Sequence, residues 1–240
     1  PPLGLRNWFW PCRRSMDETS KTLYHHRELF YPFLTGRGID IGCGTDPVTP
    51  AVMRFDLDEG DASRVNEFVD DRFDFVWSSH CLEHMDDPSD ALRRWWSLVI
   101  PGGTLIVVVP DEDLYEQGFY PSRFNADHRA TFTVHKEHSW SPVSVNLRDE
   151  LEGLGGGAIR LLVVQDDGLD HSLLASGPDG ISPFSRLFWT VIAVILKAVG
   201  ADDFHRLRAA RRRGVLIDQT LFDDRRLAQI AAVVQKRADV

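Results

Sequence analysis

The sequence predicts an α/β fold built on an open, mostly parallel β-sheet. Two observations carry this prediction. Short apolar segments typical of buried strands alternate with helix-forming segments along residues 36–111. The first apolar segment, GIDI at 38–41, runs directly into a glycine-rich turn, GCGTDP at 42–47. Such a turn follows the first strand of nucleotide-binding α/β sheets, because glycine lets the backbone turn sharply and approach a ligand.

Length and composition indicate one globular domain, residues 1–240, with 43% hydrophobic and 26% charged residues. The formal charge of −9 lacks the basic footprint of a general nucleic-acid binder, so we expect no nucleic-acid partner. Three scattered cysteines, Cys12, Cys43 and Cys81, favour a reducing compartment. The N-terminal stretch has no signal-peptide pattern, and the longest apolar run, 187–200, is too short to span a membrane. We therefore expect a cytoplasmic protein, with peripheral membrane contact left open.

The elements of the first half follow in order. An N-terminal arm, 1–35, holds helix-period apolar positions within 21–34. The segment VMRFDLDEGDA (52–62) predicts a second strand that ends in acidic residues. The segment FDFVWSSHCLEHMDDP (73–88) predicts a strand, a polar turn and a helix start, and helix-forming sequence continues to residue 98. A Pro-Gly-Gly turn then leads into the buried strand of IPGGTLIVVVPD (100–111).

The second half is less regular. Residues 112–146 are rich in aromatic, His, Pro and Ser residues and follow the carboxyl end of a strand, where open α/β sheets bind their ligands. A capped helix within 141–155 and a strand at 158–166 come next. Residues 168–226 form an insertion with an apolar helix (184–199) and a basic helix (205–213), and 227–236 is a terminal strand. The basic run 208–213 is either a solvated helix face or a contact for an anionic lipid or polysaccharide.

Four motifs at matching distances resemble those of class I S-adenosylmethionine-dependent methyltransferases. These are the GxG turn, the acids after the second strand, LEH at 82–84 and PGG at 101–103. The resemblance covers residues 36–111, the cofactor half, and implies S-adenosyl-L-methionine as cofactor. It also implies a Rossmann-like, mostly parallel seven-stranded sheet with an antiparallel C-terminal strand, here with a helical insertion. The first crossover is short, since Asp56 lies only fourteen positions after Gly42, and this leaves Asp56 and Asp58 both open as the ribose ligand.

The predicted cofactor residues lie at the ends of the first three strands. We expect Asp56 to bind the ribose and Asp61 the adenine edge, although both could be surface acids. No lysine follows the glycines, which argues against a phosphate loop. The full predicted set is Asp40, Gly42, Gly44, Asp56, Asp61, Ala62 and Ser79.

A divalent metal ion is a further expectation. A helix that begins near Ser79 would place His80, Glu83 and His84 on one face. The arrangement resembles the ExxEH metal site of some O-methyltransferases, with His80 in place of the first Glu. We expect Glu83, His84 and His128 to hold Mg²⁺ or Mn²⁺, with His80 as a further ligand or a catalytic base. The alternative is that LEH is structural, as in metal-free relatives.

Residues 112–138 are the predicted acceptor wall. His128 can accept a hydroxyl proton or complete a metal shell. Aromatic faces and hydrogen-bonding edges beside it are typical of sugar binding, although they could equally form a packed lid. The predicted substrate-binding residues are Asp111, Tyr115, Tyr120, Phe124 and Asn125.

The segment DEDLYEQGFYPSRFNADHRATFT resembles bacterial methyltransferases of polysaccharide synthesis, and most closely actinobacterial methylmannose polysaccharide O-methyltransferases. This resemblance implies methylation of a sugar hydroxyl in an oligosaccharide or polysaccharide precursor, such as the 1-OH of a methylmannoside. Three alternatives stay open: methylation of a non-sugar small molecule on O or N, an NAD-dependent enzyme, and a nucleotide-binding protein without activity. Pro47 stands where the third glycine of the NAD motif would fall. A homodimer also stays open.

Overall fold

A computed structural model describes residues 16–175, 177, 182–201, 203–221 and 225–238. The stretch 1–15, with Cys12 and most of the predicted arm's first half, lies outside the described residues. Among the residues that are described, no helix is both long enough and apolar enough to cross a membrane.

The centre of the molecule is a six-stranded sheet with the order β2-β1-β3-β4-β8-β7. Strands β1 (Gly38–Ile41), β2 (Met53–Phe55), β3 (Phe73–Ser79) and β4 (Val99–Pro110) pair in parallel. The terminal strand β8 (Gln229–Lys236) runs antiparallel to β4 and to β7 (Gly157–Gln165). The predicted α/β fold, with a mostly parallel sheet and an antiparallel C-terminal strand, is confirmed.

The described part of the sheet has six strands and not the predicted seven. The segment between β2 and β3 holds only an acidic turn and the 3-10 helix η3 (Ala62–Glu67), which leaves no length for another strand. The crossover from β1 to β2 is equally short and contains no helix. The sheet therefore ends at β2, one strand earlier than the resemblance implied.

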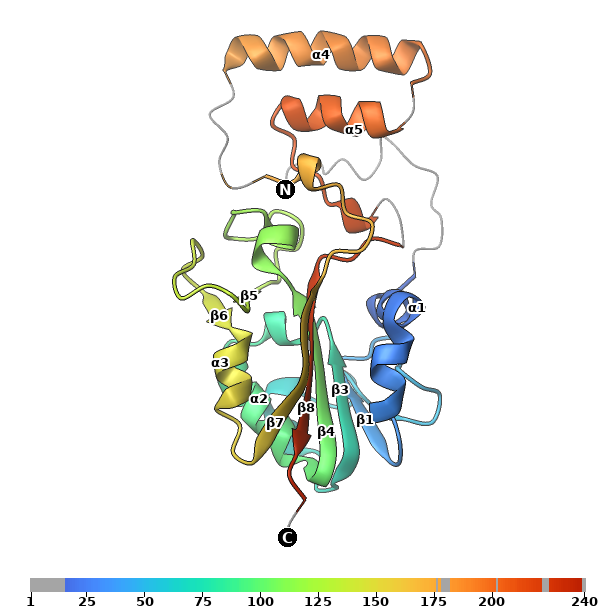
Figure 1. The fold of residues 1–240 in the computed structure, drawn as a ribbon, viewed down its shortest axis with the longest axis vertical. Helices are drawn as coiled ribbons and strands as arrows, with labels where there is room; N and C mark the ends of the chain where they lie inside the picture. Colours follow the sequence, from blue (N-terminus) through green and yellow to red (C-terminus); the bar gives the residue numbers. More distant parts are fainter. Residues whose placement is uncertain (1–15, 176, 178–181, 202, 222–224, 239–240) are drawn as a thin grey trace.

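Helices cover both faces of the sheet (Figure 1). On one face, α1 (Glu18–Phe30) packs Phe30 against Trp77 of β3, with ring centroids 5.3 Å apart. On the other face, α2 (Pro88–Ser97) and α3 (Leu147–Glu152) bury Trp95 and Leu151. Because successive strand residues point to opposite faces, the central strands feed both cores and are buried throughout.

Above the carboxyl ends of the strands lies the segment after β4. It begins with a short π-helical turn, η5 (Glu112–Glu116), and continues into a small parallel pair, β5 (Thr131–Thr133) and β6 (Ser144–Asn146). The insertion after β7 contains η6 (His171–Leu173), α4 (Pro183–Ala198), α5 (Asp203–Arg212) and η7 (Gln219–Leu221). Helices α4 and α5 lie beside each other at the end of the molecule remote from the sheet (Figure 1).

The LEH segment does not form the α-helix that was predicted to start near Ser79. Instead His80 has a left-handed backbone (φ 53°), and a single 3-10 turn, η4 (Leu82–His84), follows it. The next helix begins only at Pro88, after the capping residue Asp87. The shared helical face predicted for His80, Glu83 and His84 is therefore wrong, although the three side chains still meet by another route.

Candidate active site

The glycine-rich turn follows β1 at the carboxyl edge of the sheet. Gly42 and Gly44 both have positive φ, 77° and 51°. A Cβ on Gly42 would lie 2.5 Å from the Cys81 side chain, whereas a Cβ on Gly44 would meet no atom within 4 Å. Gly42 is therefore required by packing, and Gly44 is the glycine that borders open space where a ligand could approach.

Asp40 lies under this turn in the middle of β1. Its carboxyl is fully buried, and one oxygen, Oδ2, accepts a 2.7 Å hydrogen bond from the Val48 amide. The other oxygen, Oδ1, has no hydrogen-bond partner in the described structure. Burial raises the pKa of Asp40 to about 7. A buried acid with one unused oxygen beneath the glycine turn can hold the turn and still take a polar partner.

The other predicted cofactor residues lie at the same edge. The Asp56 carboxylate accepts a hydrogen bond from the Gly44 amide, which ties the end of β2 to the glycine turn. Asp61 instead caps η3 through Ser63, and these hydrogen bonds lower its pKa. The carbonyl oxygen of Ala62 accepts a 2.9 Å hydrogen bond from the Trp95 indole. The Ser79 hydroxyl, at the end of β3, is buried and has no partner in the described structure.

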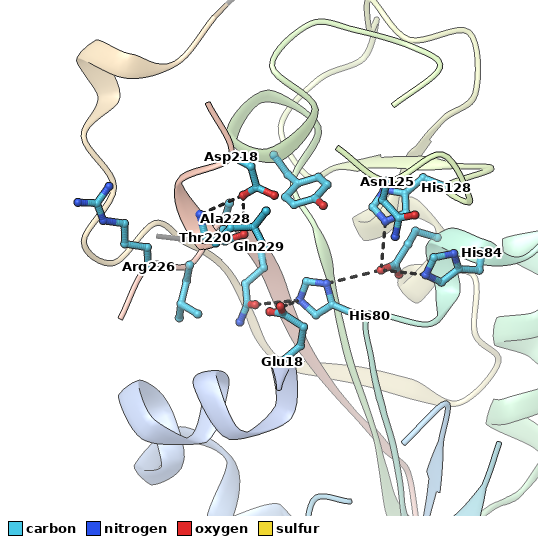
Figure 2. A pocket seen from close by; sticks show the side chains of 14 residues that line it. Glu18, His80, His84, Asn125, His128, Asp218, Thr220, Arg226, Ala228 and Gln229 are labelled. Atoms are coloured by element: carbon cyan, nitrogen blue, oxygen red, sulfur yellow. Dashed lines mark hydrogen bonds and ion pairs between the residues drawn. The ribbon is translucent and has the colours of Figure 1, made fainter. Parts of the chain in front are cut away.

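A polar cavity of about 240 Å³ opens next to this edge (Figure 2). Its wall comes from the start of α1, from the segment after β3, from η5 and the following loop, and from the insertion and β8. Most of the lining side chains carry charge or hydrogen-bonding groups. They are Glu18, His80, Glu83, His84, Tyr115, Asn125, His128, Asp218, Thr220, Leu221, Arg226, Leu227, Ala228 and Gln229.

Glu83 is the centre of the cavity floor. Its side chain is only 1% exposed, and neither carboxylate oxygen has a hydrogen-bond partner in the described structure. Ring nitrogens of His80, His84 and His128 lie 3.5, 3.9 and 3.9 Å from Oε1 (Figure 2). Burial alone raises the pKa of the Glu83 carboxyl, but these imidazoles, His80 above all, outweigh burial and lower it. The carboxylate is thus ionised and faces the cavity.

Two of these imidazoles are oriented by oxygen acceptors behind them. Nδ1 of His84 lies 3.1 Å from the Asp127 carbonyl oxygen, and Nδ1 of His128 lies 2.6 Å from Oε1 of Glu116. Since both partners accept, these contacts assign the proton to Nδ1 and leave the Nε2 lone pairs directed at Glu83. Donor atoms of Glu83, His84 and His128 lie within 4.8 Å of one another, so the predicted metal-binding residues do come together.

His80 has a different environment. Its Nε2 lies 3.0 Å from Oε1 of Gln229 and 3.8 Å from Oε2 of Glu18. Burial by itself lowers the pKa of His80, but Glu18 and Glu83 outweigh it and raise that pKa to about 9. An imidazole that is protonated at neutral pH balances the charge of the carboxylates. It is poorly suited to bind a metal ion or to take up a proton.

The predicted acceptor residues divide into two groups. Tyr115 and Asn125 line the cavity, and the Tyr115 ring lies 5.4 Å from the His128 ring. Asp111, Tyr120 and Phe124 do not line it. Asp111 caps η5, with its pKa raised to about 6 by burial. The other two have structural contacts: the Tyr120 hydroxyl donates to the Arg129 carbonyl oxygen, and Phe124 packs edge-on against Tyr115.

Sequence reasoning missed several residues of the site. Glu116 is buried in an acidic run, where nothing in the pattern separates it from the neighbouring acids. Glu18 reaches the cavity from α1, and its Oε1 binds the buried Lys21 at 2.9 Å. The remaining cavity residues belong to the insertion and β8, far away along the chain, and no local signal marks them. They are Asp218, Thr220, Arg226 and Gln229.

The start of α1 links the glycine turn to the cavity. Ser20 donates two hydrogen bonds to Asp46, from its amide (2.7 Å) and its hydroxyl (2.6 Å). Two residues earlier, Glu18 lines the cavity. The turn, the cavity and the first turn of α1 therefore form one continuous site.

Comparison with known proteins gives one family match. A family model described as a methyltransferase domain matches residues 16–155. No protein of curated function matches the chain.

Three solved structures illustrate the fold similarity. The plantazolicin methyltransferase BamL, solved with a desmethyl-plantazolicin analogue and SAH, is 14% identical over 91% of this chain and 86% of its own, with a TM-score of 0.48. A SAM-dependent methyltransferase from Archaeoglobus fulgidus is 18% identical over 90% and 94%, with a TM-score of 0.46. The [4+2]-cyclase SpnF is 17% identical over 97% and 86%, with a TM-score of 0.46.

Proposed function

The chain belongs to the methyltransferase-domain family, and from that premise we propose that it transfers a methyl group from S-adenosylmethionine to a hydroxyl group of a sugar or oligosaccharide. The family assignment confirms the prediction of an S-adenosylmethionine-dependent methyltransferase. The choice of acceptor rests on one observation. The cavity beside the glycine turn is lined mainly by charged and hydrogen-bonding side chains, which suits an acceptor with several hydroxyl groups.

The cofactor side of the proposal uses the glycine turn and the end of β2. The backbone of Gly44 borders open space, and Asp56 lies directly beside it. In open α/β sheets an acid in this position binds ribose hydroxyls. In the present structure the Asp56 carboxylate accepts from the Gly44 amide, so it is already held at the edge of the turn. We assign the nucleoside to this crevice and the methyl acceptor to the adjoining cavity.

The acceptor hydroxyl must lose its proton during transfer. When bound, S-adenosylmethionine supplies a methyl group on a sulfonium; a new O–CH₃ bond forms as the S–CH₃ bond breaks, and a neutral thioether leaves. The proton must therefore go to a base in the cavity. His128 has the geometry for this role. Its Nε2 lone pair faces the cavity, and Glu116 holds the opposite nitrogen at 2.6 Å. Glu116 would stabilise the imidazolium that forms.

The same residues fit a divalent metal ion. Both oxygens of Glu83 are buried without a hydrogen-bond partner, and the Nε2 atoms of His84 and His128 point toward them. A resident cation at these three donors would lower the pKa of a bound hydroxyl group and orient it. Two imidazoles and one carboxylate favour Mn²⁺ over Mg²⁺, because Mg²⁺ prefers oxygen ligands. Glu116 and the Asp127 carbonyl would orient the two histidines, as partners of metal-bound histidines commonly do.

A panel of acceptors tests the proposed function. Purified protein is incubated with S-adenosylmethionine carrying a labelled methyl group and with mannosides, other oligosaccharides, phenols and amines. We expect label in a sugar hydroxyl ether, with a rate that falls at least about 100-fold in His128→Ala. Label in a phenol or an amine, with none in any sugar, would refute the sugar acceptor while leaving methyl transfer intact.

A further inference from the structure

The helix pair α4 and α5 is the part of the molecule that the proposed reaction does not use. It lies at the end remote from the sheet (Figure 1). No residue of the 16-residue helix α4 is buried. Along it, large apolar side chains with 50–79% exposure recur every three or four residues. They are Phe184, Leu187, Phe188, Val191, Val194 and Ile195.

This spacing places the exposed side chains on one face of α4. The opposite side packs on α5, where the Arg212 guanidinium lies 4.4 Å from the centre of the Trp189 ring. Trp189 and Ile192 are half-buried accordingly. The helix therefore has two apolar sides, and one of them has no partner within the described chain. An exposed apolar face of this size is typical of a contact surface.

Charge indicates what that surface contacts. Residues 182–214 contain seven Lys or Arg and two Asp, a formal charge of +5 in a chain whose total is −9. The remaining residues therefore carry −14. Between 182 and 201 there is no acidic residue at all. Positive charge next to an exposed apolar face complements the anionic surface of a lipid bilayer.

The competing occupants fit less well. A second copy that packed α4 against α4 would bring two segments of charge +5 together, and like charges repel. The helix also cannot cross a bilayer, since sixteen residues at about 1.5 Å each give about 24 Å, against a hydrocarbon core of about 30 Å. A short helix with basic flanks and an apolar face lies in the plane of the membrane surface.

We propose that α4 docks this protein on an anionic lipid surface, with its exposed apolar face in the interface and the basic residues of α4 and α5 near the head groups. The chain runs from α5 into Asp218 and Thr220, which line the cavity. The docking surface and the acceptor cavity thus belong to one continuous segment of the insertion.

Flotation with lipid vesicles tests this proposal without any activity measurement. The full chain is mixed with vesicles of phosphatidylcholine alone or of phosphatidylcholine with phosphatidylglycerol. The test variant is Leu187→Ser with Val191→Ser, two exposed positions on α4. The matched control is Leu29→Ser with Tyr31→Ser, which are also exposed but lie at the end of α1 and in the 3-10 turn that follows it.

We expect the wild type and the control to float with the anionic vesicles and not with the neutral ones. Affinity for the anionic vesicles should fall at least about tenfold in the α4 variant, because two apolar side chains leave the interface. Equal circular dichroism and melting temperature would show that the variant is folded. The proposal is overturned if the wild type ignores anionic vesicles, or if the α4 variant binds them as the wild type does. A homodimer that the α4 substitutions dissociate, with no lipid binding, would assign the face to a second copy instead.

Discussion

Replacing Glu116 with Gln isolates the part of the site that orients His128. Glu116 is 1% exposed, and its Oε1 lies 2.6 Å from Nδ1 of His128. Glutamine keeps the size of the side chain and an oxygen that can accept a hydrogen bond, but it removes the negative charge. The substitution therefore weakens the orienting contact without opening a cavity.

The magnitude follows from the kind of hydrogen bond that is lost. A hydrogen bond to a charged group contributes roughly 1.5–3 kcal/mol. At about 1.36 kcal/mol per factor of ten, this corresponds to a loss of about 10- to 150-fold. Replacing partners of metal-bound histidines has a similar effect, about 10- to 100-fold in metal affinity or activity. We therefore expect kcat of Glu116→Gln to fall about 10- to 100-fold.

The assay is methyl transfer from labelled S-adenosylmethionine, together with calorimetric titration of the metal-free protein with Mn²⁺. If Glu116 orients a metal ligand, Mn²⁺ affinity falls and excess Mn²⁺ restores the rate. If it supports a general base, the rate falls and Mn²⁺ does not restore it. Glu137→Gln, at an exposed position, is the matched control. A kcat and an Mn²⁺ affinity both within about twofold of the wild type would refute the role of Glu116.

Three further predictions concern the cofactor crevice and the acceptor cavity. Since burial raises the pKa of Asp40 from 3.8 to about 7, the folded state holds a proton that the unfolded state releases near pH 4. Stability should therefore fall as pH rises from about 4 to 7, by about 4 kcal/mol, and urea titrations of Asp40→Asn should lack this loss; parallel pH curves for both proteins would contradict it. Gly44→Val should fold, because its Cβ meets no atom within 4 Å, at a cost of roughly 1–2 kcal/mol for the positive φ, yet lose affinity for S-adenosylhomocysteine in calorimetry. Gly42→Ala should mainly lower the melting temperature, because its Cβ would lie 2.5 Å from a packed side chain; unchanged affinity in Gly44→Val would move the cofactor elsewhere. Asn125→Ala should raise the acceptor KM several-fold, since Asn125 lines the cavity, whereas Tyr120→Ala should change it little; the reverse ranking in steady-state kinetics would show that the acceptor lies outside this cavity.

Much of the fold is readable from the sequence because its strands are short, apolar and bounded by turns. The terminal strand β8 and the helices of the insertion lie close to their predicted ranges. The seventh strand was expected from a family resemblance and not from residues. The 17 residues between β2 and β3 have no room for it, and that length was visible in the sequence.

The site was predictable where it depends on strand order. Glu83 and His128 follow neighbouring parallel strands, whose carboxyl ends meet at one edge, so their convergence could be expected. The backbone path was not predictable, because the left-handed conformation of His80 has no signal such as a glycine or an asparagine. Gln229 and Asp218 reach the cavity through tertiary structure alone, and a single sequence does not reveal such distant contacts.

The central claim is that Glu83, His84 and His128 form the reacting centre around a divalent ion. Methyl transfer by the exhaustively chelated enzyme, followed by readdition of Mn²⁺, tests it most directly, with His84→Asn as the variant because His84 is the most exposed of the three ligands. The account predicts that chelation abolishes transfer to the acceptor, that Mn²⁺ restores it in the wild type, and that the variant needs at least about tenfold more Mn²⁺. Full activity in the chelated wild-type enzyme would contradict the metal site and leave His128 as a base acting alone.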